Sequence, residues 1–323
     1  MANVLAIDLG GTKVMAAVVT NEGAVVASAR QQHGAYGNWP DAVGAVKKAA
    51  DKAVAKANVP WEEIQSVGIG VPGPVDHLNG LAFQLPNLGL VDVQIASDVG
   101  EVLGATVIVE NDVDAGLVGE VWRGAARGRR HAVGLFPGTG LGGAIYVNGE
   151  LVRGKTGITG EIGHMVMNPK GPRCGCGRRG CLEAYASRTA MENWVRKRYL
   201  KGYGTSLEGI DDPDSRIRSR AFLRAAQEGD TLTLRAIDRV SRYLGYAAAN
   251  LIHLLSPEII VFGGGVIEAV GPLMMDRLRE VTAERCLPGC FDGIELAEAQ
   301  CGDQATVLGV AAVTFRAMGY DIS

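Results

Sequence analysis

Short apolar runs alternate with turn residues over the first thirty or so positions of the chain. Apolar β-forming residues fill each run of NVLAIDLGGTKVMAAVVTNEGAVVASARQQ, and Gly10-Gly11 and residues 21–23 separate the runs. Runs of this composition bounded by turn residues are typical of strands. The pattern therefore predicts three consecutive strands, a β-meander, at the start of the chain.

Helical and strand patterns alternate after this meander. Residues 39–58 carry Ala and Val at helical spacing, whereas SVGIGVP and ATVIVE read as short buried strands. The segment VDAGLVGEVWRG, which follows the second of these strands, reads as a helix. Strands that alternate with helices predict an α/β fold.

A second block repeats the order of the first. HAVGLF, GTGLGG and AIYVNGELV give a strand, a glycine turn and a hairpin, as the opening segment does. We interpret this internal repeat as two domains built on one plan. After it come a mostly helical stretch at 188–255, a strand in PEIIVFGGGVI that runs into a glycine cluster, a strand in GIELAEA and a helix in QATVLGVAAVTFRAM.

The length of the chain also indicates two domains. With 323 residues, of which 47% are hydrophobic, the chain exceeds the usual size of a single core. We expect a smaller N-terminal α/β domain at 1–120, joined by a C-terminal helix at about 303–323. The larger α/β domain is expected at 121–302.

The charge and the apolar runs exclude several classes of protein. The formal net charge is -3, from 32 basic and 35 acidic residues, so the chain offers no general attraction for nucleic acid. No apolar run approaches the roughly 18 to 20 residues of a membrane helix, and the start MANVLAIDLGG lacks the features of a signal peptide. We expect a cytoplasmic protein that works on small molecules and has no membrane partner.

Three of the six cysteines are crowded into the segment CGCGRRGC, close to a histidine. His164, Cys174, Cys176 and Cys181 supply one imidazole and three thiolates, which are the four ligands of a closed tetrahedral zinc site. Because no coordination position would remain for water, such a zinc ion is structural. The alternative is a set of reduced thiols in a glycine-rich loop.

The same loop carries residues that suit a sugar. His164 belongs to GEIGH, so a metal on one ring nitrogen leaves the other for a substrate hydroxyl. Glu161 and Glu183 would lie close to the same ion and accept hydrogen bonds from sugar hydroxyls. Taken alone, each glutamate is better explained as a salt-bridge partner, but its attachment to the metal loop favours the role in sugar binding.

Three glycine clusters, DLGGTK, PGTGLGG and FGGGV, each follow a predicted strand. Backbone amides in such turns suit phosphate oxygens. Asp8 is a candidate for magnesium, directly or through water, and Thr12 and Lys13 for the phosphates, although an Asp before glycines is also a common turn former.

A nicotinamide-dependent oxidoreductase is a competing interpretation of these glycines. Gly138, Gly140 and Gly143 match the dinucleotide pattern GxGxxG. The segment AIYVNGELV that follows alternates like a strand, whereas that fingerprint requires a helix. The oxidoreductase is therefore disfavoured.

Asp112 ends a predicted strand at the start of a predicted helix. Asp is common at this position simply as an N-cap. Phosphoryl transfer to an alcohol, however, needs a carboxylate that accepts the hydroxyl proton, and Asp112 is the best-placed candidate in the sequence. Asp114 should face elsewhere, as a surface or capping residue.

Taken together, these motifs resemble those of one family. DLGGTK, GVPGPVD, PNL, END, GTGLGG, GEIGH and CGCGRRGCLE closely resemble the ROK family of bacterial sugar kinases and repressors, and more particularly its glucokinases. The resemblance covers nearly the whole chain. It implies an actin-like ATPase fold, in which two RNase H-like α/β domains close over sugar and nucleotide.

The resemblance also implies a role for each motif. Asp112 would be the base that activates the 6-hydroxyl of a hexose, with zinc on the four ligands above and magnesium accompanying ATP. The residues implied in sugar binding are Asn87, Asn111, Asp112, Glu161, His164 and Glu183. The residues implied in nucleotide binding are Asp8, Gly10, Gly11, Thr12, Lys13, Gly138, Thr139 and Gly140, with Gly264 and Gly265 near adenosine.

Within the family the resemblance leaves several functions open. Glucose is our choice of substrate, but kinases for fructose, mannose, N-acetylmannosamine or allose would use the same residues. A DNA-binding repressor of this family carries a helix-turn-helix domain before the kinase-like body, and here the first predicted strand begins within a few residues of Met1. Homodimers or homotetramers are usual in the family.

Overall fold

The computed structural model describes residues 2–34 and 37–322 of the chain. It divides into two compact units. The first comprises Met1–Arg130, Ile145–Gly160 and Asp303–Ser323, and the second His131–Ala144 and Glu161–Gly302. The domain boundary expected at 120 falls inside a helix, Asp112–Arg123, and the segment 145–160 belongs to the first unit.

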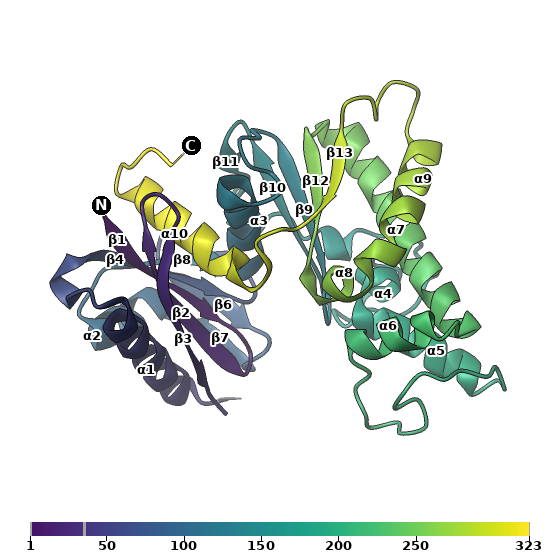
Figure 1. Ribbon diagram of the computed structural model, residues 1–323, viewed down its shortest axis with the longest axis horizontal. Coiled ribbons are helices and arrows are strands. Elements are labelled where there is room, and N and C mark those ends of the chain that lie inside the picture. The colour runs from purple at the N-terminus through teal and green to yellow at the C-terminus, as the bar shows by residue number, and fades with distance from the viewer. Residues whose placement is uncertain (1, 35–36, 323) are drawn as a thin grey trace. The chain divides into compact units, whose positions relative to one another are not determined.

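A five-stranded sheet forms the centre of the first unit (Figure 1). Its strands, in spatial order, are β3 (Val25–Gln32), β2 (Lys13–Thr20), β1 (Asn3–Leu9), β4 (Ile64–Val71) and β8 (Val107–Asn111). The first three form the antiparallel meander predicted from the sequence, and β4 and β8 run parallel to β1. Parallel strands carry their carboxyl ends to the same edge.

The register of this sheet fixes the place of the predicted functional residues. Asp8 of β1 lies opposite Gly70 of β4, and Gly70 lies opposite Glu110 of β8. Asn111 is the last residue of β8, and Asp112 is the first residue of the helix α3 (Asp112–Arg123). The sheet therefore brings Asp8 and Asp112 to one edge.

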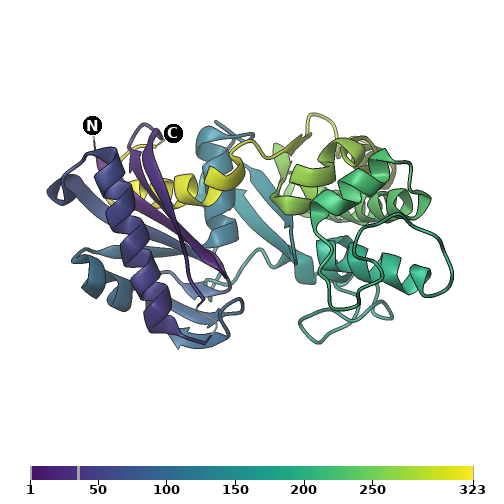
Figure 2. The same cartoon turned by 60° about the horizontal axis from the view of Figure 1, so that its bottom comes forward.

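Helices cover both faces of the sheet (Figure 2). Helix α1 (Trp39–Ala57) contacts β2 and β3, and α10 (Ala305–Ala317) contacts β1 and β4. Helix α1 begins with Asn38 as its N-cap and buries a stripe of Ala and Val, as its spacing predicted. The core of this unit consists largely of Val, Ile, Leu and Ala side chains.

Small residues allow α10 to approach both the sheet and α3. A Cβ atom on Gly309 of α10 would lie 1.6 Å from the Ala115 carbonyl oxygen of α3, and one on Gly119 of α3 would lie 2.2 Å from the Ala305 oxygen. A Cβ atom on Gly68 of β4 would lie 2.4 Å from a methyl carbon of Val310. Backbone therefore meets backbone where α10 crosses α3.

A small sheet and a short helix were not anticipated from the sequence. They are β5 (Val75–Asp76), β6 (Leu81–Leu85), β7 (Leu90–Val93) and α2 (Ile95–Leu103). The hairpins of the sheet are antiparallel, and Gly80 accepts a hydrogen bond from the Ala96 amide at the start of α2. This sheet carries Asn87 between β6 and β7.

The second five-stranded sheet has helices between its later strands along the chain (Figure 1). Its strands in order are β11 (Glu150–Leu151), β10 (Leu141–Val147), β9 (Ala132–Pro137), β12 (Ile259–Phe262) and β13 (Glu295–Glu298). The helices are α4 (Glu183–Ala186), α5 (Arg188–Tyr199), α6 (Ser219–Gln227), α7 (Thr231–Leu255), α8 (Gly264–Val270) and α9 (Met275–Arg285). The segment after GTGLGG is a strand, as predicted.

Among residues 2–34 and 37–322, no helix combines the length and the apolar character that crossing a bilayer requires.

The crossing of α3 and α10 gives a stability prediction. Gly309→Ala should lower the free energy of unfolding by roughly 1 to 3 kcal/mol. The new methyl group would clash with the backbone of α3 at Ala115 and force the two helices apart. Gly116→Ala in α3 is the matched control, since a Cβ atom there meets nothing within 4 Å. The control should be stabilised by about 0.5 to 1 kcal/mol through helix propensity. Urea denaturation measures both, and equal stability of the two variants would contradict the packing described here.

Candidate functional site

The side chains of Asp8 and Asp112 lie at the edge of the first sheet where its parallel strands end. Burial, together with the nearby charge of Asp8, raises the pKa of Asp112 to about 7. Burial also raises the pKa of Asp8 to about 6, while Lys13 acts in the opposite direction. A carboxylate with a pKa near neutrality is suited to accept a proton at physiological pH.

The helix that follows this edge is capped by Asn111. The Asn111 side-chain oxygen accepts hydrogen bonds from the Val113 and Asp114 amides at 2.9 and 3.0 Å, and its Nδ2 donates to the Gly73 carbonyl at 2.9 Å. Asn111 is therefore the N-cap of α3, and Asp112 is the first helical residue. Asn111, rather than Asp112, therefore has the capping role that was considered for Asp112.

Asp114 was wrongly placed by the sequence analysis as a surface or capping residue. Its relative exposure is only 7%. All residues of α3 from Asp114 to Trp122 are buried, so most of the helix has no side that faces water. The position of Asp114 two residues after Asp112 indicates which side of α3 it occupies, but not whether that side is covered.

A buried ion pair supports the end of β8. Glu110, whose side chain is 3% exposed, pairs with Arg153 and accepts a hydrogen bond from the Asn111 amide at 3.1 Å. Arg153 lies on the segment 145–160, which belongs to the same unit. The pair restrains the backbone immediately before Asp112, and the sequence analysis singled out neither residue.

The predicted phosphate turn of the first unit is tightly folded. The Gly10 amide donates to the Lys13 carbonyl at 3.0 Å. A cavity of about 430 Å³ lies beside this turn, and Thr12, Lys13 and His33 are among the residues that line it. A Cβ atom on Gly11 would lie 2.8 Å from the Asn87 Cβ, so the predicted phosphate turn and the predicted sugar residue Asn87 are in contact.

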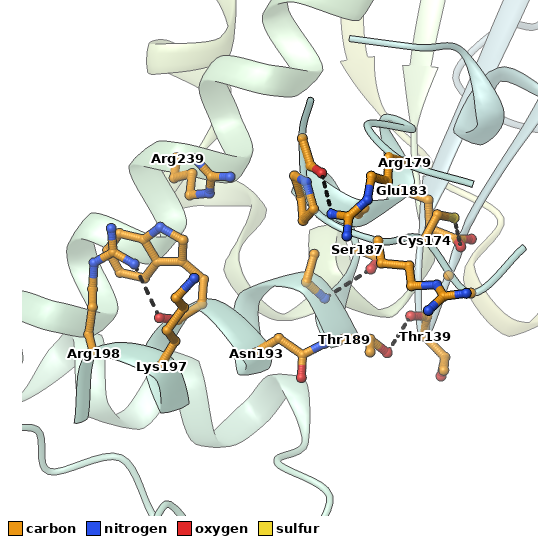
Figure 3. A pocket seen from close by; sticks show the side chains of 18 of the residues that line it. Thr139, Cys174, Arg179, Glu183, Ser187, Thr189, Asn193, Lys197, Arg198 and Arg239 are labelled. Carbon is orange, nitrogen blue, oxygen red and sulfur yellow. Dashed lines mark hydrogen bonds between the residues drawn. The ribbon is translucent and has the colours of Figure 1, made fainter. Parts of the chain in front are cut away.

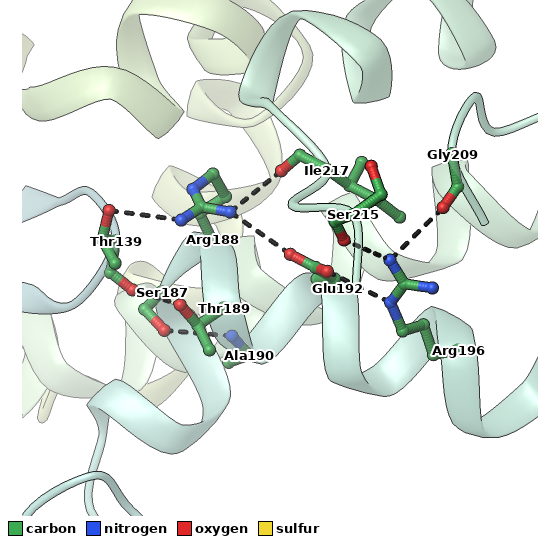
Figure 4. Close-up of polar contacts among 10 residues, drawn as sticks. All are labelled: Thr139, Ser187, Arg188, Thr189, Ala190, Glu192, Arg196, Gly209, Ser215 and Ile217. Atoms are coloured by element: carbon green, nitrogen blue, oxygen red, sulfur yellow. Dashed lines mark hydrogen bonds and ion pairs between the residues drawn. The ribbon is translucent and has the colours of Figure 1, made fainter. Parts of the chain in front are cut away.

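The second glycine turn is held by the start of α5 (Figure 4). Arg188 donates from its backbone amide to the Gly138 carbonyl at 2.9 Å and from its guanidinium to Thr139 Oγ1 at 3.2 Å. The Thr189 hydroxyl donates to the Thr139 carbonyl at 2.7 Å. Arg188 and Thr189 are functional candidates that the sequence analysis missed, although Ser187 before a helical pattern was a detectable N-cap signal.

Glu183 joins this glycine turn to the cysteine-rich loop. Its Oε2 accepts a hydrogen bond from the Leu141 amide at 3.0 Å, and its Oε1 lies 3.2 Å from the Cys174 sulfur. A Cβ atom on Gly140 would lie 2.4 Å from the Glu183 carboxylate. The salt-bridge alternative considered for Glu183 finds no support, because its described partners are a backbone amide and a thiol.

His164, Cys174, Cys176 and Cys181 come together in space. Their ligand atoms all lie within 4.8 Å of one another. The Cys176 and Cys181 sulfur atoms are 3.8 Å apart, and His164 Nδ1 is 3.8 Å from the Cys174 sulfur. Two sulfur atoms bound tetrahedrally at about 2.3 Å from zinc are also separated by about 3.8 Å. The residues fit a structural zinc ion.

The second nitrogen of His164, Nε2, lies near Glu161. His164 Nε2 lies 3.9 Å from Glu161 Oε2, and both side chains are partly exposed. Because Nδ1 points toward Cys174, Nε2 is the nitrogen left for another partner. This is the arrangement that the sequence analysis expected for a histidine shared between a metal and a hydroxyl.

The third glycine cluster packs against the second. Gly264 begins α8 with a φ of +75°, a conformation that favours glycine, and a Cβ atom there would lie 3.0 Å from the Pro137 carbonyl oxygen. Gly265 follows it in the same helix. These two residues therefore adjoin the turn that contains Gly138, Thr139 and Gly140.

The candidate residues form two sets, one in each compact unit. The first unit contains Asp8, Gly10, Gly11, Thr12, Lys13, Asn87, Asn111 and Asp112. The second unit contains Gly138, Thr139, Gly140, Glu161, His164, Cys174, Cys176, Cys181, Glu183, Gly264 and Gly265.

Comparison with known proteins gives three close relationships. A glucokinase of Thermotoga maritima is 33% identical over 98% of this chain and 98% of its own. A ROK family glucokinase from Streptomyces griseus, solved with glucose and AMPPNP, has a TM-score of 0.81 and 29% identity, covering 97% of this chain and 99% of its own. A xylose repressor of Caldicellulosiruptor bescii is 32% identical over 83% of this chain and 67% of its own.

The family profile and the fold agree. The ROK family profile matches residues 4–316, and the structural match confirms the actin-like ATPase fold implied by the motifs. The chain belongs to the ROK family.

Proposed function

We propose that this protein is an ATP-dependent hexose kinase that phosphorylates the 6-hydroxyl of glucose, with Asp112 as the general base. The observation that carries the proposal is the half-buried Asp112 carboxylate at the edge of the sheet, whose pKa is raised to about 7 and whose side chain is not the N-cap of α3. Relatives named as glucokinases match nearly the full length of the chain and support this proposal.

The proposed reaction needs a base and a phosphate site. Asp112 accepts the proton of the 6-hydroxyl as the oxygen attacks the γ-phosphate of ATP, and ADP leaves. Asp8 would hold magnesium directly or through water, and the DLGGTK and GTGLGG turns would bind phosphates. Phosphoryl transfer depends mainly on positioning and on electrostatic stabilisation, so little other covalent chemistry is required of the protein.

Five polar side chains are the candidates for binding the sugar. Asn87 and Asn111 in the first unit and Glu161, His164 and Glu183 in the second are the proposed partners of its hydroxyls. His164, Cys174, Cys176 and Cys181 would hold zinc, which fixes the loop and the tautomer of His164 when bound. Since Asn111 already uses its oxygen on two amides and Nδ2 on Gly73, its share in binding is the smallest.

A kinase for another hexose is the alternative, because the same residues serve fructose, mannose, N-acetylmannosamine or allose. Relatives named as xylose repressors also match this chain. A sugar-responsive repressor would bind its sugar without using ATP, so measuring turnover separates the two functions.

The first prediction concerns sugar choice and the base. Purified protein with ATP and magnesium should release ADP selectively with glucose among the five hexoses named above. Asp112→Asn should lower kcat by about a hundredfold or more, because the base is lost, with little change in sugar affinity. Near-normal turnover by this variant would remove Asp112 from the mechanism.

Folding controls accompany this variant. Asp276→Asn, at a carboxylate 96% exposed on α9, should leave turnover unchanged. The fold raises the pKa of Asp112 from 3.8 to about 7, so protonation of this carboxyl stabilises the folded protein. This stabilisation is lost as the pH rises through about 7. At pH 8 Asp112→Asn should therefore melt no lower than the wild type, so lost activity cannot be ascribed to unfolding.

The second prediction concerns zinc. Purified protein should contain one zinc per chain, and Cys181→Ser should lose it, whereas Cys290→Ser, outside the cluster, should retain it. The zinc-free variant should show a KM for glucose raised about tenfold or more, because the loop that carries His164 is loosened. Metal analysis and steady-state kinetics measure both effects. Unchanged glucose affinity in a demonstrably zinc-free sample would break the link between metal and sugar.

A further inference from the structure

A histidine beside the first glycine turn has no role in the proposed reaction. This residue, His33, lines the cavity of about 430 Å³ together with Thr12 and Lys13. The larger cavity of the second unit, shown in Figure 3, includes Thr139 and Cys174 and so belongs to the sites already described. His33 adds to the predicted phosphate turn a side chain that the motif DLGGTK does not contain.

His33 directly follows the last strand of the meander. Strand β3 ends at Gln32, which pairs with Lys13 of β2. The His33 amide donates to the Thr12 carbonyl at 3.0 Å, so the ladder between β2 and β3 continues for one residue beyond the strands. This backbone bond places His33 next to the turn at 10–12.

The ring of His33 forms a second hydrogen bond to the same turn. His33 Nε2 lies 3.0 Å from the Gly10 carbonyl oxygen. A carbonyl oxygen can only accept, so Nε2 carries the proton and donates. His33 therefore holds the carbonyl groups at both ends of the turn, that of Thr12 through its backbone and that of Gly10 through its ring.

The ring nitrogens of His33 are not placed for proton transfer. Nε2 donates to Gly10, and Nδ1 is buried and has no hydrogen-bond partner among residues 2–34 and 37–322. A catalytic acid or base has to reach the proton that it transfers. A buried nitrogen without a partner also lowers stability, so the stability of the fold does not explain this ring. The arrangement fits a residue that positions the turn.

The bond from the ring to Gly10 fixes the direction of the next amide. The peptide bonds of the described residues are trans, and in a planar trans peptide the carbonyl and the following N–H point in opposite directions. Holding the Gly10 carbonyl toward His33 therefore turns the Gly11 amide away from His33. Two consecutive glycines restrict their own conformation poorly, so the turn depends on a partner to keep one orientation. A backbone amide kept in one direction is suited to binding a phosphate oxygen.

We propose that His33 is a positioning residue for the nucleotide, and that it holds the Gly10–Gly11 peptide in the orientation that presents the Gly11 amide to a phosphate group. This inference rests on the proposed kinase function, because it concerns the phosphate turn of that site. It adds a residue outside the DLGGTK motif on which the conformation of the motif depends. Loss of the ring bond should weaken the binding of nucleotide more than the binding of sugar.

Calorimetric titration of the full-length protein with magnesium and AMPPNP, an ATP analogue, tests the role of the ring. His33→Leu removes the donor and should weaken the affinity for AMPPNP by about three- to tenfold, with glucose affinity changed by less than about twofold. His33→Gln should restore the affinity for AMPPNP to within about twofold of the wild type. Its amide nitrogen is as many bonds from Cα as Nε2 of histidine is, so it can donate to the Gly10 carbonyl.

His253→Leu is the matched control. His253 is exposed on α7 in the second unit, and its Nε2 accepts a hydrogen bond from the Leu287 amide at 3.0 Å. This variant therefore makes the same substitution and also loses one hydrogen bond between a ring and the backbone. It should bind AMPPNP and glucose as the wild type does, and thermal melting should show that all three variants are folded.

A measurement on the wild type tests the ring bond itself. A ¹H–¹⁵N correlation spectrum of the histidine rings should show neutral His33 as the Nε2–H tautomer, because Nε2 donates to Gly10. The spectrum of His33→Gln, which lacks this signal, assigns it. The Nδ1–H tautomer would overturn the proposed bond.

The outcomes of the titrations separate this inference from the kinase proposal. Unchanged affinity for AMPPNP in His33→Leu, or equal weakening for AMPPNP and glucose, would overturn the positioning role and leave the kinase proposal intact. Failure of His33→Gln to restore the affinity would overturn the hydrogen bond as its cause. A wild-type protein that does not bind AMPPNP would contradict both proposals.

Discussion

The rest of the site depends on two half-buried carboxyl groups at one edge of a sheet. Asp8 and Asp112 are brought there by β1 and β8, which lie on either side of β4 with Gly70 between them. Burial raises the pKa values of both groups toward neutrality, and the charge of Asp8 adds to the rise at Asp112. This arrangement of carboxyl groups destabilises the folded protein, but it is suited to accepting a proton. The packing of α10 on α3 and the Glu110–Arg153 pair stabilise the sheet edge that carries them.

Sequence reasoning succeeded where the chemistry is local. Cysteines two and five residues apart beside a glycine-rich turn leave few alternatives to a common site, and the four ligand atoms do converge. The opening meander and the strand after GTGLGG followed from apolar runs between turn residues. The motifs also identified the family, because seven of them occur together along nearly the whole chain.

What sequence reasoning missed depends on contacts between distant segments. The small β5–β7 sheet has short strands that hardly alternate, and Asp114 is buried because it lies on a helix that is covered along most of its length. Glu183 is turned toward the Leu141 amide by the approach of α4 to the glycine turn, which no local pattern reveals.

The pH dependence of kcat/KM for glucose tests the role of this carboxylate pair most directly. The base must be ionised, so activity should fall as pH is lowered through about 7, with an apparent pKa that belongs to the Asp8–Asp112 pair in the free enzyme. A ¹³C titration of the carboxyl carbons should show a group with that pKa, absent from Asp112→Asn. A flat activity profile between pH 5 and 8, with Asp112 titrating near 4, would contradict the account.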